Sequence, residues 1–473
     1  MQHADRSALL GTTDMRRLVP KVSLPIMFSM IVQALYNIVD SYYISQYNPN
    51  GLTAVSLALP FQMLMIALST GMGTGINSLI SRRLGEQKTQ VARRASWNGL
   101  LIEAAGSFLF IMIGLFLAGS LMNLVVDGNL KNRGSILQMG TEYLSIVTTW
   151  SMGLFVAIFF ERLLQSTGNT MASMVTQLCG ALTNIILDPI LIFGGTLGLE
   201  PMGISGAAIA TVIGQWVSAI VGFTLNQVKN EELRLKLSDF RVCGRDIRDI
   251  IAVGLPSTIM ASIGSVMNVC MNAILSGFAE NNAALNVMSV YFKLQSFIFM
   301  PVFGLANGII AIIGYNYGAR NKKRIYQCVK VALIWAGTIM IIGTLIFMFF
   351  PNALMSLFEQ KNTTDPETIA LTEQMTQIGV VAMRIICLNF IFAAVGITLS
   401  TVFQAIGKGT YSMILSICRQ LVILLPAAWL LARITGSVYA VWWCFPIAEI
   451  VSLFICLFFY RRCNRKMLAP LPD

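Results

Sequence analysis

The stretch LPIMFSMIVQALYNIVDSYYISQY, residues 24–47, decides the fold class. It is apolar over a length that crosses a bilayer core of about 30 Å as one helix. Its single carboxylate, Asp40, lies about 10 Å inside the run, at ~1.5 Å of rise per residue. An ionised side chain at that depth is costly and usually faces a cavity, a partner or an ion path.

Asp40 is therefore the first candidate for an ion or substrate site. Asn37 lies three residues earlier, on the same helical face, and joins it as a candidate. The alternative is that Asp40 sits near the helix end and only reaches the lipid headgroups. The apolar residues that continue beyond Asp40 favour the buried position.

The composition extends this conclusion to the whole chain. Hydrophobic residues make up 56% of the 473 and charged residues 12%, about half of the charged share of soluble domains. Twelve apolar runs are each long enough to span a membrane. They cover about 18–47, 52–81, 95–122, 138–164, 169–194, 202–226, 247–278, 284–316, 327–350, 375–403, 409–432 and 438–460.

Several classes of protein are disfavoured. The first twenty residues are polar, so we expect no cleavable signal peptide. Nine scattered cysteines without a C-x-x-C pair suggest neither disulfides nor zinc, and the sole histidine, His3, precedes the first span. No nucleotide-binding G-x-x-x-x-G-K-[ST] motif occurs. We therefore expect neither an enzyme nor a cofactor or metal centre. The net charge of +11 comes from basic residues in the loops between spans, so we expect no nucleic-acid partner either.

Lys and Arg residues predict the orientation. With twelve spans both termini share one side, and the loops and tails on that side hold twenty-six of these residues. The opposite side holds four, namely Lys131, Arg133, Lys361 and Arg433. We therefore expect a multi-pass protein of the bacterial inner (plasma) membrane with both termini cytoplasmic. Glu161 and Arg162 are expected at a solvated cytoplasmic helix end.

The second half of the chain repeats the first. Leu24-Pro25 recurs as Leu255-Pro256 and Asn37 as Asn268, at an offset of 231. A second set recurs at an offset of 233 and a third at 239. These sets are Gly71, Gly75 and Gly85 with Gly304, Gly308 and Gly318, and Gln165, Gly168 and Met174 with Gln404, Gly407 and Met413. We expect the glycines to serve close helix packing rather than ligand contact.

The fold class predicted is an all-α membrane protein with twelve transmembrane helices in two pseudo-symmetric six-helix lobes. Six spans per lobe make the repeats parallel, related by an axis along the membrane normal. The expected divisions are a leader (1–17), an N-lobe (18–226), a charged, partly amphipathic linker (227–246), a C-lobe (247–460) and a tail (461–473).

The fifth span carries a second acid in the sequence Asn184-Ile-Ile-Leu-Asp188-Pro189. Asn184 and Asp188 share a helical face. Pro189 lacks an amide donor, so the carbonyl of Ile185 is left free to bind a cation. Broken helices at transporter sites expose carbonyls in the same way, and we expect a helix break at Pro189. A proline kink with Asp188 as an interfacial cap is the alternative.

Asp40 and Asp188 lie at similar distances from the outer ends of their spans, so we expect them at similar depth. Two carboxylates in a site of low dielectric constant favour protonation of one or capture of a cation. The second lobe has Met271 and Ala427 at the equivalent positions. Its buried charges are predicted to be Lys293, Arg384, Arg419 and Glu449, and cation binding is assigned to the first lobe.

Together these residues resemble the multidrug and toxic compound extrusion (MATE) transporters, in particular their bacterial DinF-like and MepA-like branches. The resemblance rests on the repeat, on Leu24-Pro25 with Asp40, on the Asn184-to-Pro189 motif, on Gly203-Ile-Ser-Gly206, and on Pro446-Ile-Ala-Glu449. It implies a V-shaped pair of lobes that exports cationic amphipathic drugs or dyes in exchange for H⁺ or Na⁺. It also implies that Thr211 joins Asp40, Asn184 and Asp188 in the coupling site, where Na⁺ could bind.

Met27, Met30, Met260 and Met267 on the first and seventh spans are candidates for an adaptable substrate-cavity wall. A monomer in the lipid bilayer is expected. The rival within transport is a flippase or exporter of an amphipathic lipid or lipid-linked metabolite, which needs a basic groove, with Arg384 and Arg419 as candidates. A membrane enzyme that acts on prenyl or lipid phosphates would need clustered acids such as D-x-x-x-D to bind Mg²⁺, and this sequence contains none.

Overall fold

The computed structural model describes residues 7–126, 132–194, 200–358 and 366–472. Throughout these ranges the regular elements are helices. Eleven of them are long and apolar enough to cross a membrane, and a bent pair supplies a twelfth span. The all-α architecture with twelve spans is thereby confirmed. Lys131 and Lys361, counted on the outer side above, lie outside the described residues.

The first half contains α1 to α9 and the second half α10 to α19, with short 3₁₀ and π segments between and within them. In the first half the bounds are α1 Ala8–Thr12, α2 Met15–Tyr47, α3 Pro49–Gly85, α4 Thr89–Phe116, α5 Ala118–Val125, α6 Arg133–Thr149, α7 Met152–Ser166, α8 Thr170–Phe193 and α9 Gly203–Lys229. The linker has η2 Glu231–Leu233 and η3 Leu237–Asp239. In the second half they are α10 Gly244–Leu275, α11 Asn281–Gly318, α12 Lys322–Phe349, α13 Pro351–Ser356, α14 Pro366–Ile386, η4 Cys387–Asn389, α15 Phe390–Ala405, α16 Gly409–Ile417, η5 Cys418–Leu424, α17 Leu425–Thr435, α18 Val438–Val441, α19 Cys444–Cys463 and η6 Asn464–Leu468.

One predicted span is not a single helix. The run 138–164 consists of α6 and α7, which meet at an angle of 47°. The break follows Val147, Thr148 and Thr149, whose branched side chains have low helix propensity. The expectation of one continuous helix is corrected here, because apolar length shows that a segment can span a membrane but not that it is straight.

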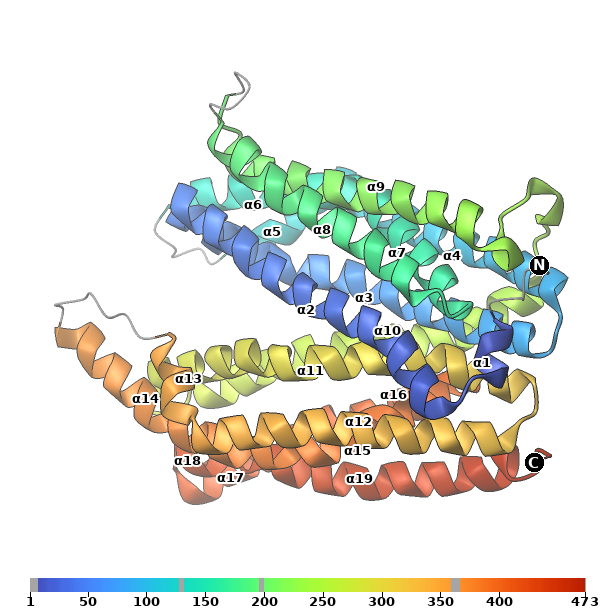
Figure 1. Cartoon of the computed structure of the whole chain (residues 1–473). Helices are drawn as coiled ribbons and strands as arrows, with labels where there is room; N and C mark the ends of the chain where they lie inside the picture. Colours follow the sequence, from blue (N-terminus) through green and yellow to red (C-terminus); the bar gives the residue numbers. More distant parts are fainter. Residues whose placement is uncertain (1–6, 127–131, 195–199, 359–365, 473) are drawn as a thin grey trace.

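The helices form two groups that approach each other along the middle of the molecule. Figure 1 shows α4 to α9 above and α12 to α19 below, with α2, α3, α10 and α11 between them. The groups lie close together at the end that carries both termini and diverge toward the opposite end. The contacts cross between the halves, because α10 packs on α3 and α2 packs on α11.

The repeated glycines lie where these helices cross. A Cβ atom at Gly71 would collide with Thr258 of α10, and one at Gly304 would collide with Met27 of α2. Thr258 and Met27 are themselves equivalent at the offset of 231. Two more pairs of contacts are related in the same way. Gly75 faces Gly254 as Gly308 faces Ser23. Gly85 faces Tyr315 as Gly318 faces Arg82.

These six contacts form the seam between the halves. Each contact has a counterpart in which the two halves have exchanged roles, so the structure confirms the internal repeat. The close approach also confirms that the glycines serve helix packing. Gly168 and Gly407, equivalent at the offset of 239, both adopt positive φ angles, of 76° and 85°.

The linker packs along the first half. Its two 3₁₀ turns run beside α4, where Arg93 Nε donates to the carbonyl of Glu232 at 2.8 Å and Trp97 Nε1 to that of Lys236 at 3.0 Å. Leu233 is fully buried, whereas Leu237 is 83% exposed. The partly amphipathic pattern thus corresponds to turns with one buried side rather than to a helix.

The short helix α1 connects the two halves at the end that carries the termini. On one side, the amide and hydroxyl groups of Ser7 donate to Glu232 Oε1 at 3.1 and 2.9 Å. On the other, Asn316 Nδ2 donates to the carbonyl of Leu10 at 3.0 Å, and Arg324 Nη2 donates to the carbonyls of Leu10 and Thr13 at 3.1 and 2.7 Å. The described part of the leader, from Ser7 to Thr13, is therefore a bridge between the halves and not only a polar extension.

The bridge depends on Arg324. Because hydrogen bonds from a charged donor contribute about 1.5–3 kcal/mol each, Arg324→Ala should loosen α1 without unfolding the transmembrane helices. We expect amide hydrogen exchange at residues 9–12 to become at least tenfold faster in Arg324→Ala than in the unmodified protein. Lys330→Ala, on the same helix but outside the bridge, is the control. Unchanged exchange in α1 would contradict this role.

Candidate ion site and central cavity

The first half brings the two predicted acids to the same level by fixing α2 and α8 side by side. On one side of the acids, Gln177 Nε2 donates to Gln33 Oε1 at 3.1 Å. On the other, Tyr43 and Tyr47 of α2 contact the ring of Phe193 in α8, with centroids 6.3 and 6.2 Å apart. Asp40 and Asp188 lie between these contacts, and their charges act on each other.

A close helix crossing adds the third element of the site. Gly180 of α8 and Gly214 of α9 face each other so closely that a Cβ atom at either would lie within 3 Å of the other's carbonyl oxygen. One turn away, Asn184 Nδ2 donates to Asp188 Oδ1 at 3.1 Å and to Thr211 Oγ1 at 3.4 Å. The structure thus brings together Asn184, Asp188 and Thr211.

The oxygens of this site outnumber their donors. Asp188 is fully buried, and its Oδ2 has no hydrogen-bond partner. Asp40 Oδ1 and Asn184 Oδ1 are likewise buried and without a partner. An unpaired buried acceptor is costly, and the cost is far greater for an ionised carboxylate. A proton on one of the acids, or a cation bound by these oxygens, would remove much of that cost.

Two predicted members are placed differently. Asn37 is exposed rather than in the site, because three residues turn a helix by about 300° and leave it some 60° away from Asp40. Pro189 does not break the helix, since α8 continues through it to Phe193. The predicted helix break is corrected to a continuous helix, in which Pro189 still offers no amide to the carbonyl of Ile185.

Aromatic and amide side chains complete the surroundings of the acids. Tyr36 and Tyr143 both lie within electrostatic range of Asp40 and Asp188. Tyr143 is buried and donates through its hydroxyl to Gln62 Oε1 at 3.2 Å. Sequence reasoning did not single out these residues. Tyr36 precedes Asp40 by one helical turn, a spacing that could have indicated it, whereas Tyr143 and Gln62 carry no such signal.

Glu161 and Arg162 are not at a solvated helix end, and this expectation is wrong. They are 9% and 7% exposed and lie on α7. Gly73 of α3 makes room for Arg162, since a Cβ atom there would lie 2.8 Å from Cγ of the arginine. Glu103, 1% exposed, is a third charge in this region, and its Oε2 accepts from Ser69 Oγ at 2.9 Å.

A cavity of about 500 Å³ lies between the halves. Met30 and Met260, two of the predicted methionines, line it. The other two do not: Met27 packs against Gly304, and Met267 is buried in the hydrophobic core. Asp40 and Asp188 are also outside the lining, so the ion site and the cavity are distinct parts of the structure.

The predicted buried charges of the second half divide into two kinds. Lys293 and Arg384 are exposed, which corrects their assignment as buried, and Lys293 lies 5.9 Å from the ring of Phe358. Arg419 is partly buried and forms an ion pair with Glu449 at 3.1 Å. Because α16 gives way to the π-helical segment η5 at Cys418, Arg419 belongs to an irregular stretch beside the cavity.

Comparisons with known proteins agree with this architecture. The MatE family model matches residues 25–190 and 256–430, one segment in each half. The chain is 27% identical to the multidrug export protein MepA of Staphylococcus haemolyticus, over 94% of this chain and 93% of that protein. It is 25% identical to the probable multidrug resistance protein NorM of Thermotoga maritima, over 89% and 86%.

The fold is shared with solved structures. An outward-facing multidrug resistance MATE family transporter of the MOP superfamily superposes with a TM-score of 0.87 at 24% identity, over 99% of both chains. The fold and the paired family match define a transporter with two repeated halves. The chain belongs to the MATE family.

Proposed function

We propose that this protein is a secondary active antiporter that exports amphipathic small molecules, cationic drugs and dyes among them, in exchange for H⁺ or Na⁺. The coupling ion binds at Asp40, Asn184, Asp188 and Thr211. Two relatives of similar length are named for multidrug export or resistance. Family membership supports a transporter, and the site in the first half supports coupling to a cation.

One observation carries the proposal. Three oxygen atoms of Asp40, Asn184 and Asp188 are buried without a hydrogen-bond partner, inside helices that are long and apolar enough to cross a membrane. A structural role would be served better by paired or apolar groups. Carboxylate, amide and hydroxyl oxygens are also the ligands that hard cations prefer. Cation binding therefore explains both the residue types and their unpaired state.

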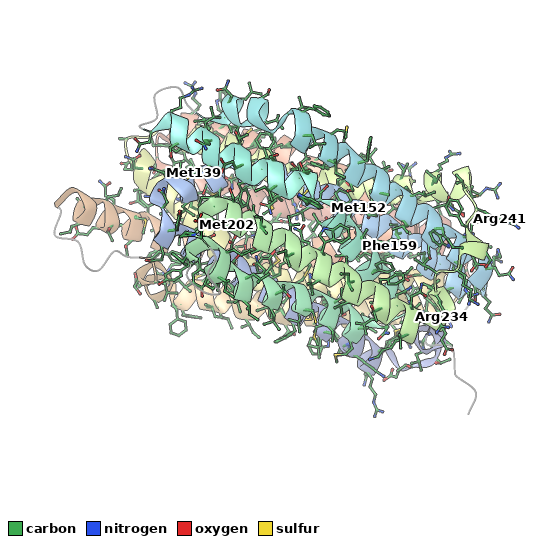
Figure 2. The ribbon with its side chains drawn as sticks, turned by 90° about the horizontal axis from the view of Figure 1, so that it is seen from above. Met139, Met152, Phe159, Met202, Arg234 and Arg241 are labelled. Atoms are coloured by element: carbon green, nitrogen blue, oxygen red, sulfur yellow. The ribbon has the colours of Figure 1, made fainter. Side chains whose placement is uncertain are left out.

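The orientation and the assembly follow as part of the proposal. Figure 2 shows the linker arginines Arg234 and Arg241 at the end opposite Met139 and Met202. Basic loops stay on the cytoplasmic side of a membrane, so we assign that end and both termini to the cytoplasm of a bacterial cell. The opposite end, toward which the halves diverge, faces outward. Each chain contains both halves and its own site, which fits a monomer.

The alternative of lipid export receives less support. It requires a basic groove, but Arg384 is exposed and is not part of the cavity lining, and Arg419 is paired with Glu449. The proposal is tested by adding a quaternary ammonium dye to everted membrane vesicles with an imposed pH or Na⁺ gradient and measuring its accumulation inside them, since the cytoplasmic face of such vesicles is outside. Dye movement should follow one of the two gradients. Movement that ignores both, together with export of a phosphate-bearing lipid, would replace antiport with lipid export.

A further inference from the structure

The charges of the central cavity differ from those of the ion site. Its lining contains two charged residues, Arg162 and Arg419, and both are cations. Within the described part of the chain, no carboxylate lines this cavity. The remaining lining is apolar or neutral, and its polar members include Thr70, Thr74, Ser257, Asn307, Ser400 and Gln404. A purely cationic ligand would thus find no opposite charge in contact.

The two arginines are not equivalent. Arg419 is neutralised by its ion pair with Glu449 at 3.1 Å. Arg162 Nη1 donates to the neutral side chain of Gln165 at 2.9 Å, whereas its Nε is buried without a partner. At 7% exposure, Arg162 is a buried guanidinium that borders the cavity with unused donor capacity.

Two carboxylates lie near Arg162 without pairing with it. The charges of Glu103 and Glu161 both act on the guanidinium. Neither forms an ion pair with it within 4 Å in the described structure, and neither borders the cavity. Because Coulomb energy falls with distance and rises where water is excluded, an acid in direct contact with Arg162 would interact more strongly than these more distant groups do.

We propose that the central cavity recognises a carboxylate on an amphipathic small molecule, with Arg162 as its partner. A guanidinium offers several N–H donors in a fixed plane that matches a carboxylate. Met30, Met260 and Phe303 provide an adjacent apolar wall for the rest of the ligand. The inference specifies a substrate class for the transport proposed above and rests on it.

The test uses two dyes that differ only at the acid. Rhodamine 110 has a free carboxylate, and rhodamine 123 is its methyl ester with the same xanthene core. We expect the purified full-length protein to bind rhodamine 110 at least tenfold more tightly in fluorescence anisotropy titrations. Arg162→Gln should remove this preference by weakening rhodamine 110 alone, and Arg162→Lys should retain part of it. Arg384→Gln, which removes an exposed cation away from the cavity, should behave like the unmodified protein.

The possible failures have separate meanings. Equal binding of the two dyes by the unmodified protein would overturn the proposal, as would an equal loss of both in Arg162→Gln and Arg162→Lys. Neither result would bear on whether the unmodified protein exports a dye along an ion gradient in vesicles. By contrast, vesicles that show no gradient dependence would refute the antiport function itself, whatever the dye preference of the cavity.

Discussion

Asp188→Asn should abolish gradient-driven efflux, to the level of vesicles that lack the protein. Asparagine has nearly the same volume as aspartate. Unlike a carboxylate, however, its amide neither takes up a proton at physiological pH nor supplies a negative charge to a cation. The donor that now serves Asp188 Oδ1, Asn184 Nδ2, would remain beside a neutral amide. Asp40→Asn should have the same effect, since the two charges act on each other.

The folded state should survive both substitutions. Each removes a buried charge that has an unpaired oxygen, so the desolvation penalty disappears with the charge. We expect thermal unfolding temperatures in detergent at or above that of the unmodified protein. Glu200→Gln, an exposed acid outside the site, is the matched control for both assays. Normal export against a gradient by both Asp variants would show that coupling occurs elsewhere.

Gly85→Ala and Gly318→Ala should each destabilise the protein strongly and by similar amounts. A Cβ atom at Gly85 would overlap the backbone carbonyl of Tyr315, and one at Gly318 would overlap that of Arg82. Backbone atoms cannot move aside as a flexible side chain can. We therefore expect each substitution to lower the free energy of unfolding by about 1–3 kcal/mol or more, the cost typical of overpacking. The measurement is the unfolding temperature of each variant.

Gly337→Ala provides the matched control, because no atom lies within 4 Å of a Cβ atom at this helical position. Alanine favours a helix over glycine by about 1 kcal/mol, so this variant should be unaffected or more stable. If Gly85→Ala and Gly318→Ala proved as stable as Gly337→Ala, the seam would not be held at the observed distance. A marked effect at only one of the two would contradict its symmetry.

The spans, the repeat and the main acids could be predicted because each can be recognised in the sequence itself, without knowing which helices pack together. Apolar length identifies a span, and a fixed offset relates Gly71 to Gly304 whatever the packing. Asn184 and Asp188 are four residues apart on one helix, so their contact also follows from local geometry.

Burial that depends on a neighbouring helix could not be predicted in the same way. Arg162 lies near a helix end, where solvent is the ordinary expectation, and only the space left by Gly73 of α3 places it inside. Tyr143 reaches the acids from α6, far away in the chain. Asn37 shares an approximate face with Asp40, but the sequence does not show which part of that face α8 would cover.

The exchanged contacts of the seam bear on the origin of the chain. Gly71 meets Thr258 as Gly304 meets Met27, and Gly85 meets Tyr315 as Gly318 meets Arg82. Such reciprocity defines an isologous interface, the kind formed by two identical subunits about a twofold axis. A half-length chain with these glycines would possess the complete surface for such a homodimer, and joining two copies would require only a connection such as the linker.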